Sequence, residues 1–559
     1  MERTNFISLP PRHGSKITIL SIDGGGIRGI IPSVILQELE RILEDRDSSP
    51  GRKDIAQYFD VITGTSTGGL ITAMLTCPDP RDPKRPKFSA LDIVQFYRNE
   101  ASKIFPQINR FPAINKITKP LNALFGPKYS GSYLRKLAKD RLGETRLDQV
   151  LTNVVIPAFD IYRLQPKTFS RYQVNRNKIG QSSGNNERLP SINQESNKNA
   201  LSSQSNNIGQ SSSDNERPSN NHDQSPTIYN NNIDQSSGSE IPSNSSNGQS
   251  PNIVVNIDQS TGDSERPSNN NCDQLPNSIV NIGHSSGEHE RPSNNTVQGS
   301  GDNETAQSSS DDGPALLSDI CIATSAAPTY LPAQYFEVNG NKYNLIDGGV
   351  AANNPTFLAL SEVVKNIGDN KEEYPKEINP FKCTDLLVLS LGTGSPKNTG
   401  KFNAKSAAKW GMLRWLSKGG STPIIDVFSE ASVDMVDIYL RMIFRHHGCE
   451  SCDGNYLRIQ DPTLSNDLYT VDIATEDNMK RLKKEGKELL QENVSRVNLE
   501  TGEYYYSKNR NSTALRLFAD KLIEERNLRR KNMKSPTEQA STSISISTSS
   551  TSATTSTHP

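Results

Sequence analysis

SIDGGGIRG at residues 21–29 and GTSTGG at residues 64–69 are the two stretches that decide the fold. Each follows a short apolar run typical of a strand and precedes an apolar-periodic run typical of a helix. The second stretch has the G-x-S-x-G spacing of a nucleophile elbow, in which a serine is exposed on a sharp strand-to-helix turn. The first places several flexible backbone N–H groups at a helix start, where an anionic oxygen is stabilised. A nucleophile and a site for the oxyanion that it generates together indicate acyl transfer.

Ser66 is the candidate nucleophile of the elbow. Gly64 and Gly68 carry no side chains that would clash across the tight turn, and Gly69 lets the following helix pack closely on the sheet. The alternative is an ordinary Gly/Ser turn, because the bare G-x-S-x-G spacing often occurs by chance. The strand before it and the helix after it favour the elbow.

The glycine loop also satisfies the dinucleotide-binding pattern G-x-G-x-x-G, with Gly24 and Gly29 as its first and last glycines. That function needs an acidic residue about 20 positions further on, at the end of a second strand. The nearby acidic residues Glu44, Asp45 and Asp47 instead close a helix and enter a turn, not a strand. A dinucleotide site is therefore the weaker interpretation.

We expect the loop to form an oxyanion hole, to which Gly24, Gly25, Gly26 and Arg28 contribute. Successive glycines suit a loop whose N–H groups converge on one oxygen, and losing one such donor costs on the order of 100-fold in rate. Arg28 either adds positive charge there or forms a salt bridge that holds the loop.

A serine hydroxyl needs a base, and Asp347 is the candidate. It follows the apolar run 343–346, so it lies at a strand end, where the catalytic groups of α/β proteins gather. Gly348 and Gly349 follow it directly, and an Asp-Gly hairpin turn is the alternative.

A Ser-His-Asp triad is the competing arrangement, and it requires a histidine. The predicted folded stretches offer His13 in a proline-rich leader and the adjacent pair His446 and His447 in a probable loop. Neighbouring histidines point in different directions. A two-residue Ser–Asp dyad therefore fits the sequence better.

The predicted organisation is one catalytic domain built from residues 15–174 and 313–530 and interrupted by residues 175–312. The interrupting segment is an imperfect Ser/Asn/Gln repeat with too few apolar residues to bury a stacked core, so we expect disorder rather than a solenoid. The Ser/Thr-rich tail at 531–559 is expected to be disordered too. Strands are predicted at 17–22, 59–63, 154–156, 343–346 and 386–391. Helical patterns between them predict an α/β fold with a mainly parallel sheet covered on both faces.

Composition excludes several classes of protein. The net charge of −1 gives no overall electrostatic footprint of nucleic-acid binding. We find no signal-peptide pattern and no apolar run approaching the roughly 20 residues of a membrane-spanning helix. The six cysteines are scattered, so we expect no disulfide framework and a reducing, cytoplasmic setting. Cys449 and Cys452 form a lone C-x-x-C to which we assign no function, and neither a metal nor a cofactor is predicted.

Two stretches are candidates for contact with lipid. Residues 105–125 are basic, apolar and interrupted by prolines, which suits either a lid or docking surface or a broken core helix. Residues 409–416 hold both tryptophans, Trp410 and Trp415, flanked by lysine. For these tryptophans core packing is the favoured interpretation.

With these residues in place, the chain resembles the patatin-like lipid acyl hydrolases, especially those of plants. The resemblance covers residues 17–32 and 59–70, ATSAAPTY at 323–330, residues 347–355 and LSLGTG at 389–394. It implies a metal-free three-layer α/β/α sandwich, with Ser66 as nucleophile, Asp347 as base and the loop at 24–29 as oxyanion hole. The interrupting segment departs from the family pattern but spares every motif residue.

The resemblance further implies hydrolysis of fatty-acyl esters in membrane or micellar glycerolipids, namely phospholipids and galactolipids, through an acyl-enzyme. It implies roles in lipid catabolism and plant defence, a cytoplasmic protein peripheral at membranes, and no nucleic-acid partner; the oligomeric state is left open. The alternatives are a soluble esterase or thioesterase that uses the same dyad, and a storage or scaffold protein with a vestigial hydrolase core.

Overall fold

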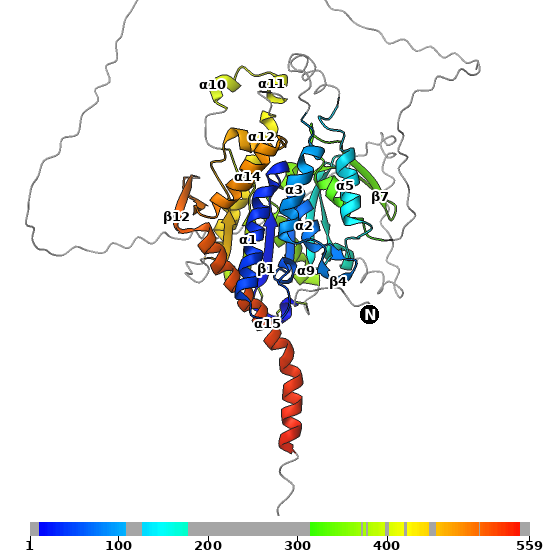
Figure 1. Ribbon diagram of the computed structural model, residues 1–559, viewed down its shortest axis with the longest axis vertical. Coiled ribbons are helices and arrows are strands. Elements are labelled where there is room, and N and C mark those ends of the chain that lie inside the picture. Colours follow the sequence, from blue (N-terminus) through cyan, green and yellow to red (C-terminus); the bar gives the residue numbers. More distant parts are fainter. Residues whose placement is uncertain are drawn as a thin grey trace, which may run out of the picture. The chain divides into compact units, whose positions relative to one another are not determined.

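A computed structural model shows how these stretches are arranged (Figure 1). It describes residues 10–107, 126–176, 313–369, 373–375, 378–396, 402–416, 418, 422–445, 454–501 and 503–547. The repeat at 177–312 lies outside these residues, and the chain on either side of it belongs to one compact unit.

The strands alternate with helices along the chain. The strands are β1 (Ile17–Ile22), β2 (Val61–Gly64), β3 (Pro78–Asp79), β4 (Asp82–Pro86), β5 (Asn153–Asp160), β6 (Gln165–Ser170), β7 (Gln334–Val338), β8 (Asn341–Asp347), β9 (Leu386–Leu391), β10 (Tyr456–Ile459), β11 (Asn493–Val497) and β12 (Tyr504–Arg510). The α-helices are α1 (Ile30–Arg46), α2 (Thr67–Thr76), α3 (Ala90–Ile104), α5 (Ser132–Leu142), α7 (Leu317–Thr324), α8 (Gly349–Ala352), α9 (Thr356–Asp369), α10 (Ala404–Ala407), α11 (Met412–Leu416), α12 (Pro423–Arg445), α13 (Asn466–Tyr469), α14 (Glu476–Leu489) and α15 (Asn511–Ser547). Short 3₁₀ turns lie at η1 (Pro11–His13), η2 (Gly26–Gly29), η3 (Ile55–Gln57) and η5 (Cys383–Asp385).

The main sheet has the strand order β10-β9-β1-β2-β5-β8-β7, with β6 also paired to β5. Strands β10, β9, β1, β2 and β5 run parallel to their neighbours, whereas β8 is antiparallel to β5 and β7 is antiparallel to β8. The predicted mainly parallel sheet is therefore confirmed. Its antiparallel edge contains the strand that follows the 177–312 segment and leads to Asp347.

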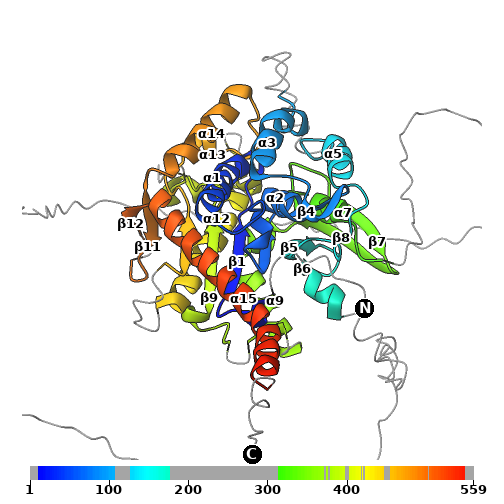
Figure 2. The same cartoon turned by 60° about the horizontal axis from the view of Figure 1, so that its bottom comes forward.

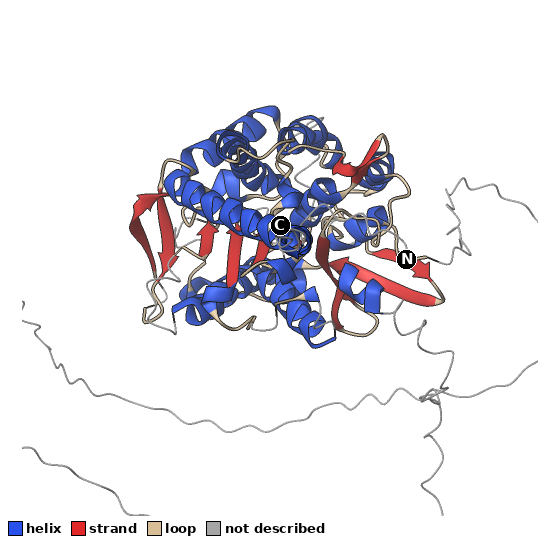
Figure 3. Ribbon diagram, turned by 90° about the horizontal axis from the view of Figure 1, so that it is seen from below, coloured by secondary structure: helices blue, strands red, loops and turns tan. Residues whose placement is uncertain are grey.

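Helices cover both faces of the sheet, as the predicted three layers require (Figure 3). Side chains alternate along β1, so that Leu20 and Ile22 join the core formed with α1, α14 and α15. Ile17 and Ile19 point the other way and pack with residues of α9 and α12. Burial on both faces explains why β1 is a continuous apolar run that the sequence alone could identify.

Helix α2 packs unusually close to the end of β1. A Cβ atom on Gly68 would lie 2.2 Å from the backbone oxygen of Ile22. A Cβ atom on Gly64 would lie 2.1 Å from the backbone oxygen of Gly68. Both glycines are thus fixed by backbone atoms that cannot move aside.

Helix α15 crosses the molecule and binds the start of β2 (Figure 2). The guanidinium of Arg529 donates to both carboxylate oxygens of Asp60, at 2.6 and 2.9 Å, and to Glu525 at 2.9 Å. All three side chains are buried. The backbone N–H of Ser15 also donates to Glu525, so the segment before β1 is attached to α15 at this cluster.

The C-terminal helix extends beyond the expected boundary of the tail. We expected unstructured chain from 531, whereas α15 continues to Ser547. Residues 548–559 lie outside the described residues. None of the described helices combines the length and the apolar character needed to cross a membrane.

One of the described cysteines forms a disulfide, which the sequence did not predict. Cys77 and Cys321 are buried and free, but Cys383 is disulfide-bonded. Since both other described cysteines are free, its partner lies outside the described residues, as do Cys449 and Cys452. The chain therefore contains a disulfide that the scattered spacing did not predict.

Replacing Arg529 by methionine should lower the free energy of unfolding by about 3–5 kcal/mol, because Asp60 would be left as a buried charge without its partner. Guanidinium-chloride unfolding of the full chain measures this effect. The matched control is Arg41→Met, whose ion pairs with Glu38 and Asp45 are exposed and should contribute no more than about 1 kcal/mol. Equal effects of the two changes would contradict the assignment.

Replacing Gly68 by alanine should destabilise the fold by roughly 1–3 kcal/mol, because the added methyl group meets the backbone of β1. Gly368→Ala is the matched control, since it also lies in a helix but has no atom within 4 Å of the added Cβ. We expect that control to change stability by less than about 1 kcal/mol, in the stabilising direction. A Gly68→Ala variant as stable as the control would show that α2 can move away from β1.

Candidate active site

Ser66 lies at the turn between β2 and α2, where it caps the N-terminus of the helix. Its backbone has φ 54° and ψ −117°, a region that non-glycine residues rarely adopt. The backbone N–H of Ser66 donates to the hydroxyl of Thr324 at 2.9 Å, and that hydroxyl donates to the backbone oxygen of Pro157 at 2.6 Å. Thr324 therefore holds the strained turn in place from the far side of the 177–312 segment.

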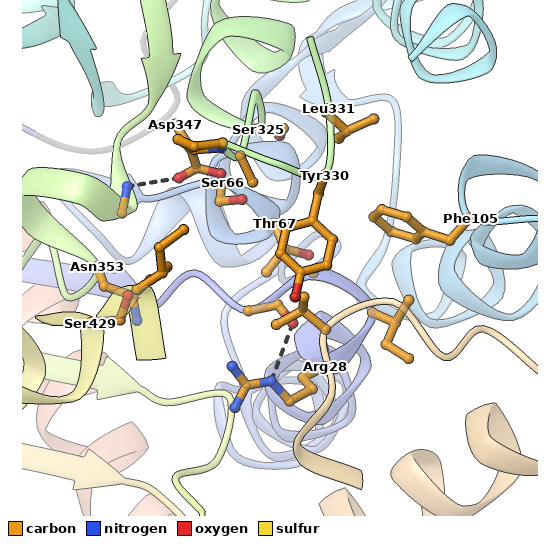
Figure 4. Close-up of a pocket in the computed structure, with 18 of the residues that line it drawn as sticks. Arg28, Ser66, Thr67, Phe105, Ser325, Tyr330, Leu331, Asp347, Asn353 and Ser429 are labelled. Carbon is orange, nitrogen blue, oxygen red and sulfur yellow. Dashed lines mark hydrogen bonds between the residues drawn. The ribbon is translucent and has the colours of Figure 1, made fainter. Parts of the chain in front are cut away.

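Asp347 faces Ser66 because of the register of the sheet. Thr63 of β2 pairs with Val155 of β5, and Ser66 lies three residues beyond Thr63. Ala158, three residues beyond Val155, pairs with Asp347 at the end of β8. The antiparallel strand thus returns to the level of the elbow, and Figure 4 shows the two side chains next to each other.

The Asp347 carboxylate is buried, and burial raises its pKa to about 6. A hydrogen bond from the Ser66 side chain and another from the backbone N–H of Gly349, at 2.7 Å, lower the pKa and so limit the rise. Gly348 is required beside it, since a Cβ atom there would lie 2.3 Å from the backbone oxygen of Pro157. The carboxylate is therefore desolvated, fixed in orientation and in direct contact with the serine.

The glycine loop presents two N–H groups to the cavity. Gly24 is not one of them, because its N–H donates to the backbone oxygen of Asn353 at 3.1 Å. Within the described part of the chain, the N–H groups of Gly25 and Gly26 have no acceptor, and both residues line the cavity beside Ser66. Of the residues predicted for the oxyanion hole, Gly25 and Gly26 therefore have backbone N–H groups without an acceptor among the described residues, whereas Gly24 does not.

Arg28 holds the glycine loop rather than offering a free charge. Its Nε donates to the backbone oxygen of Gly25 at 3.3 Å (Figure 4), and its Nη1 donates to the backbone oxygen of Gly394. Its guanidinium also lies 4.4 Å from the centre of the Tyr469 ring. These contacts favour the supporting role that the sequence left open, although the partners are carbonyl groups and a ring instead of a salt bridge.

A cavity of about 540 Å³ is lined by Ser66 and Asp347, and most of its wall is apolar. The apolar lining comes from α2, α3, α5, α12 and the loop after α7: Leu70, Phe96, Ala101, Ile104, Phe105, Leu134, Tyr330, Leu331, Ile424, Ile425 and Phe428. An apolar cavity that contains Ser66 suits a substrate with a hydrocarbon chain.

The histidines of the alternative triad are not among the described residues that line this cavity. His13 lies in η1, which packs against α15, while His446 and His447 lie outside the described residues. Among the described residues no group of three or more His, Cys, Asp or Glu side chains could hold a metal ion. Phe105 of the predicted docking stretch lines the cavity, and residues 108–125 of that stretch lie outside the described residues.

Two residues that support the site were not predicted from the sequence. Thr324 holds the backbone of the nucleophile, and the Asn353 backbone oxygen fixes Gly24. Both stand inside motifs that we had noted, ATSAAPTY at 323–330 and residues 347–355. Their presence in those motifs was the available signal, but their contacts depend on the fold.

Comparison with known proteins agrees with this geometry. A family profile described as patatin-like phospholipase matches residues 20–230 and 275–360, which include Ser66 and Asp347. Patatin-like protein 2 of Arabidopsis thaliana is 40% identical over 499 residues, covering 88% of this chain and 87% of that protein. Patatin-like protein 2 of Oryza sativa subsp. indica is 36% identical over 533 residues, covering 93% and 96%. Patatin-T5 of Solanum tuberosum is 30% identical over 524 residues, covering 92% of both.

The resemblance predicted from the motifs is thereby confirmed over most of the chain. The fold, the family profile and the extent of these similarities agree with one another. The chain belongs to the patatin-like phospholipase family and is a hydrolase that acts on lipid esters.

Proposed function

We propose that the protein cleaves fatty-acyl esters of membrane glycerolipids, with Ser66 as the nucleophile and Asp347 as the base. The observation that carries this proposal is the contact between the buried Asp347 carboxylate and Ser66 at the end of an apolar cavity. No imidazole is needed, because a desolvated carboxylate with its pKa raised to about 6 is a stronger base than an exposed one.

In the first half of the reaction the Ser66 hydroxyl attacks the ester carbonyl and Asp347 accepts its proton. The tetrahedral intermediate collapses to an acyl-enzyme, and the proton moves from Asp347 to the departing lyso-lipid oxygen. In the second half water attacks the acyl-enzyme and gives its proton to Asp347. The fatty acid leaves, and the same proton returns to the Ser66 oxygen.

Charge on the carbonyl oxygen is stabilised by the N–H groups of Gly25 and Gly26. Their lack of any other acceptor among the described residues supports this role. The contacts of Arg28 keep the loop in the conformation that exposes these groups. Preorganised donors of this kind are effective because they need no rearrangement during the reaction.

The apolar cavity is the proposed acyl-chain site, which favours lipids over short water-soluble esters. Phospholipids and galactolipids share the acyl ester that the dyad requires, and both reside in membranes or micelles. We therefore infer a peripheral contact with membranes. Roles in lipid catabolism and in defence signalling stay predictions.

Ser66→Ala should abolish fatty-acid release from mixed phospholipid and galactolipid micelles, because no nucleophile remains. Asp347→Asn keeps the shape but cannot accept the proton, so we expect a loss of about 10²–10⁴-fold in kcat. Ser429→Ala and Asp426→Asn are matched controls that also line the cavity, and they should stay within a few-fold of wild type. Circular dichroism checks that each variant is folded.

Other outcomes of that experiment would redirect the proposal. Loss in Ser66→Ala but not in Asp347→Asn would identify a different base, and His446 or His447 would be tested next. Activity confined to monomeric esters would favour the esterase or thioesterase alternative. If wild type released no fatty acid from any lipid, a storage or scaffold role would replace the hydrolase mechanism.

The pH dependence should report the titration of Asp347. Its pKa is about 6, and the carboxyl accepts a proton only when ionised, so kcat/KM should fall about tenfold per pH unit below 6 and level off above it. A water-soluble monomeric ester is the substrate of choice, because its aggregation does not change with pH. A flat profile between pH 4 and 8 would rule out Asp347 as the base.

A further inference from the structure

Helices α11 and α12 expose an apolar surface that the proposed chemistry does not use. Met412 and Leu413 of α11 are 78% and 68% exposed, and Phe428 of α12 is 70% exposed. We name the following residues the α11–α12 surface: Met412, Leu413, Leu416, Val427 and Phe428. A groove of about 450 Å³ runs between the two helices, and its wall is almost wholly apolar. Exposed apolar groups gathered in this way mark an interaction site.

This surface is continuous with the catalytic cavity. Ile424 and Phe428 line both the surface groove and the cavity that contains Ser66 and Asp347. In Figure 1, α11 lies at one end of α12. A hydrocarbon chain entering from the surface would therefore meet apolar side chains along its route to the nucleophile.

The chain around α11 is strongly basic. Residues 402–416 and 418 carry Lys405, Lys409, Arg414 and Lys418, and this described segment contains no Asp or Glu. Lys405, Lys409 and Arg414 are exposed. Cationic side chains beside an apolar surface complement the anionic headgroups and acyl chains of a phospholipid layer.

An aromatic cluster of Phe402, Trp410 and Trp415 packs at helix α11. Trp410 is buried, as the sequence predicted, and its ring lies 5.1 Å from that of Trp415 and 5.7 Å from that of Phe402. The ammonium of Lys418 lies 4.0 Å from the centre of the Trp410 ring. Trp410 thus packs inward and the half-buried Trp415 lines the groove, while Met412 and Leu413 of α11 are exposed.

We propose that the α11–α12 surface docks on an anionic phospholipid bilayer and passes lipid from it to the catalytic cavity. The inference rests on the proposed function, because it assigns the membrane contact of that function to particular residues. It places docking on α11 and α12; of the stretch at 105–125, Phe105 packs against Tyr129, and residues 108–125 lie outside the described residues.

Docking is tested on the full chain carrying Ser66→Ala, so that no lipid is consumed. Co-sedimentation measures binding to vesicles of an equal mixture of phosphatidylcholine and phosphatidylglycerol. Adding Leu413→Asp should weaken binding by about tenfold or more, because an apolar side chain no longer enters the lipid. Leu164→Asp is the matched control, since Leu164 is 78% exposed in the turn between β5 and β6, away from this surface. It should bind as the parent does.

A second variant tests whether the lysines near α11 contribute to vesicle binding through their charge. Lys405→Glu combined with Lys409→Glu should weaken binding to the mixed vesicles by about tenfold or more, since each cation near a membrane contributes about 1 kcal/mol. Binding to vesicles of phosphatidylcholine alone should change little. Equal losses on both kinds of vesicle would show that the lysines act through the fold rather than through anionic lipid.

Activity separates a failure of docking from a failure of the proposed function. With Ser66 intact, Leu413→Asp should retain hydrolysis of a monomeric ester and lose release from vesicles. Vesicle binding by Ser66→Ala, in contrast, is measurable whether or not the wild type has activity. Equal vesicle binding by the Leu413→Asp and Leu164→Asp variants would overturn the proposal.

A second copy of the chain is the other occupant that this surface could accept. Exposed apolar side chains continue along α12 at Phe428, Met435 and Met442, a seven-residue spacing that also suits helix pairing. Sedimentation velocity without lipid distinguishes the two cases. A dimer that Leu413→Asp dissociates would overturn the membrane assignment, and a monomer unaffected by that change supports it.

Discussion

The strained backbone at Ser66 is the constraint on which the active site depends. A φ of 54° is unfavourable for serine, so the turn persists only because its surroundings fix it. The absence of a side chain at Gly68 lets α2 lie close to the end of β1. The hydroxyl of Thr324 accepts a hydrogen bond from the backbone N–H of Ser66. The elbow is therefore braced by the sheet on one side and by α7 on the other. The strained backbone of Ser66, the close packing of α2 on β1 and the position of Ser66 in the cavity wall therefore depend on one another.

The partner of Ser66 reaches it through the antiparallel edge of the sheet. Strand β8 runs antiparallel to β5 and pairs only with its last residues, so that Asp347 lies opposite Ala158, at the level of the elbow. Burial there raises the carboxyl pKa to about 6, while Ser66 and Gly349 keep it oriented. The two parts of the chain on either side of the 177–312 segment thus supply one residue each to the proposed dyad.

The glycine loop and the lipid-facing surface show how the rest of the fold serves the proposed dyad. Arg28 donates to the carbonyl groups of Gly25 and Gly394, and the N–H groups of Gly25 and Gly26, two residues that line the cavity, have no acceptor among the described residues. On the far side, Phe428 belongs both to the cavity and to the exposed apolar surface. Polar groups at one end and apolar groups at the other match the two ends of an acyl ester.

Features that depend on neighbouring residues could be predicted before the fold was known. The boundaries of β1 and β9 were predicted from continuous apolar runs, and the turn at Ser66 was predicted from the spacing of the glycines. The sequence did not predict β10, because Arg458 interrupts that strand's apolar pattern and is tolerated only through its buried ion pair with Asp23. Only the tertiary structure decided that Gly24 donates to Asn353 and that Arg28 supports the loop. Local spacing fixes backbone conformation, whereas contacts between distant segments decide which polar groups remain free to act.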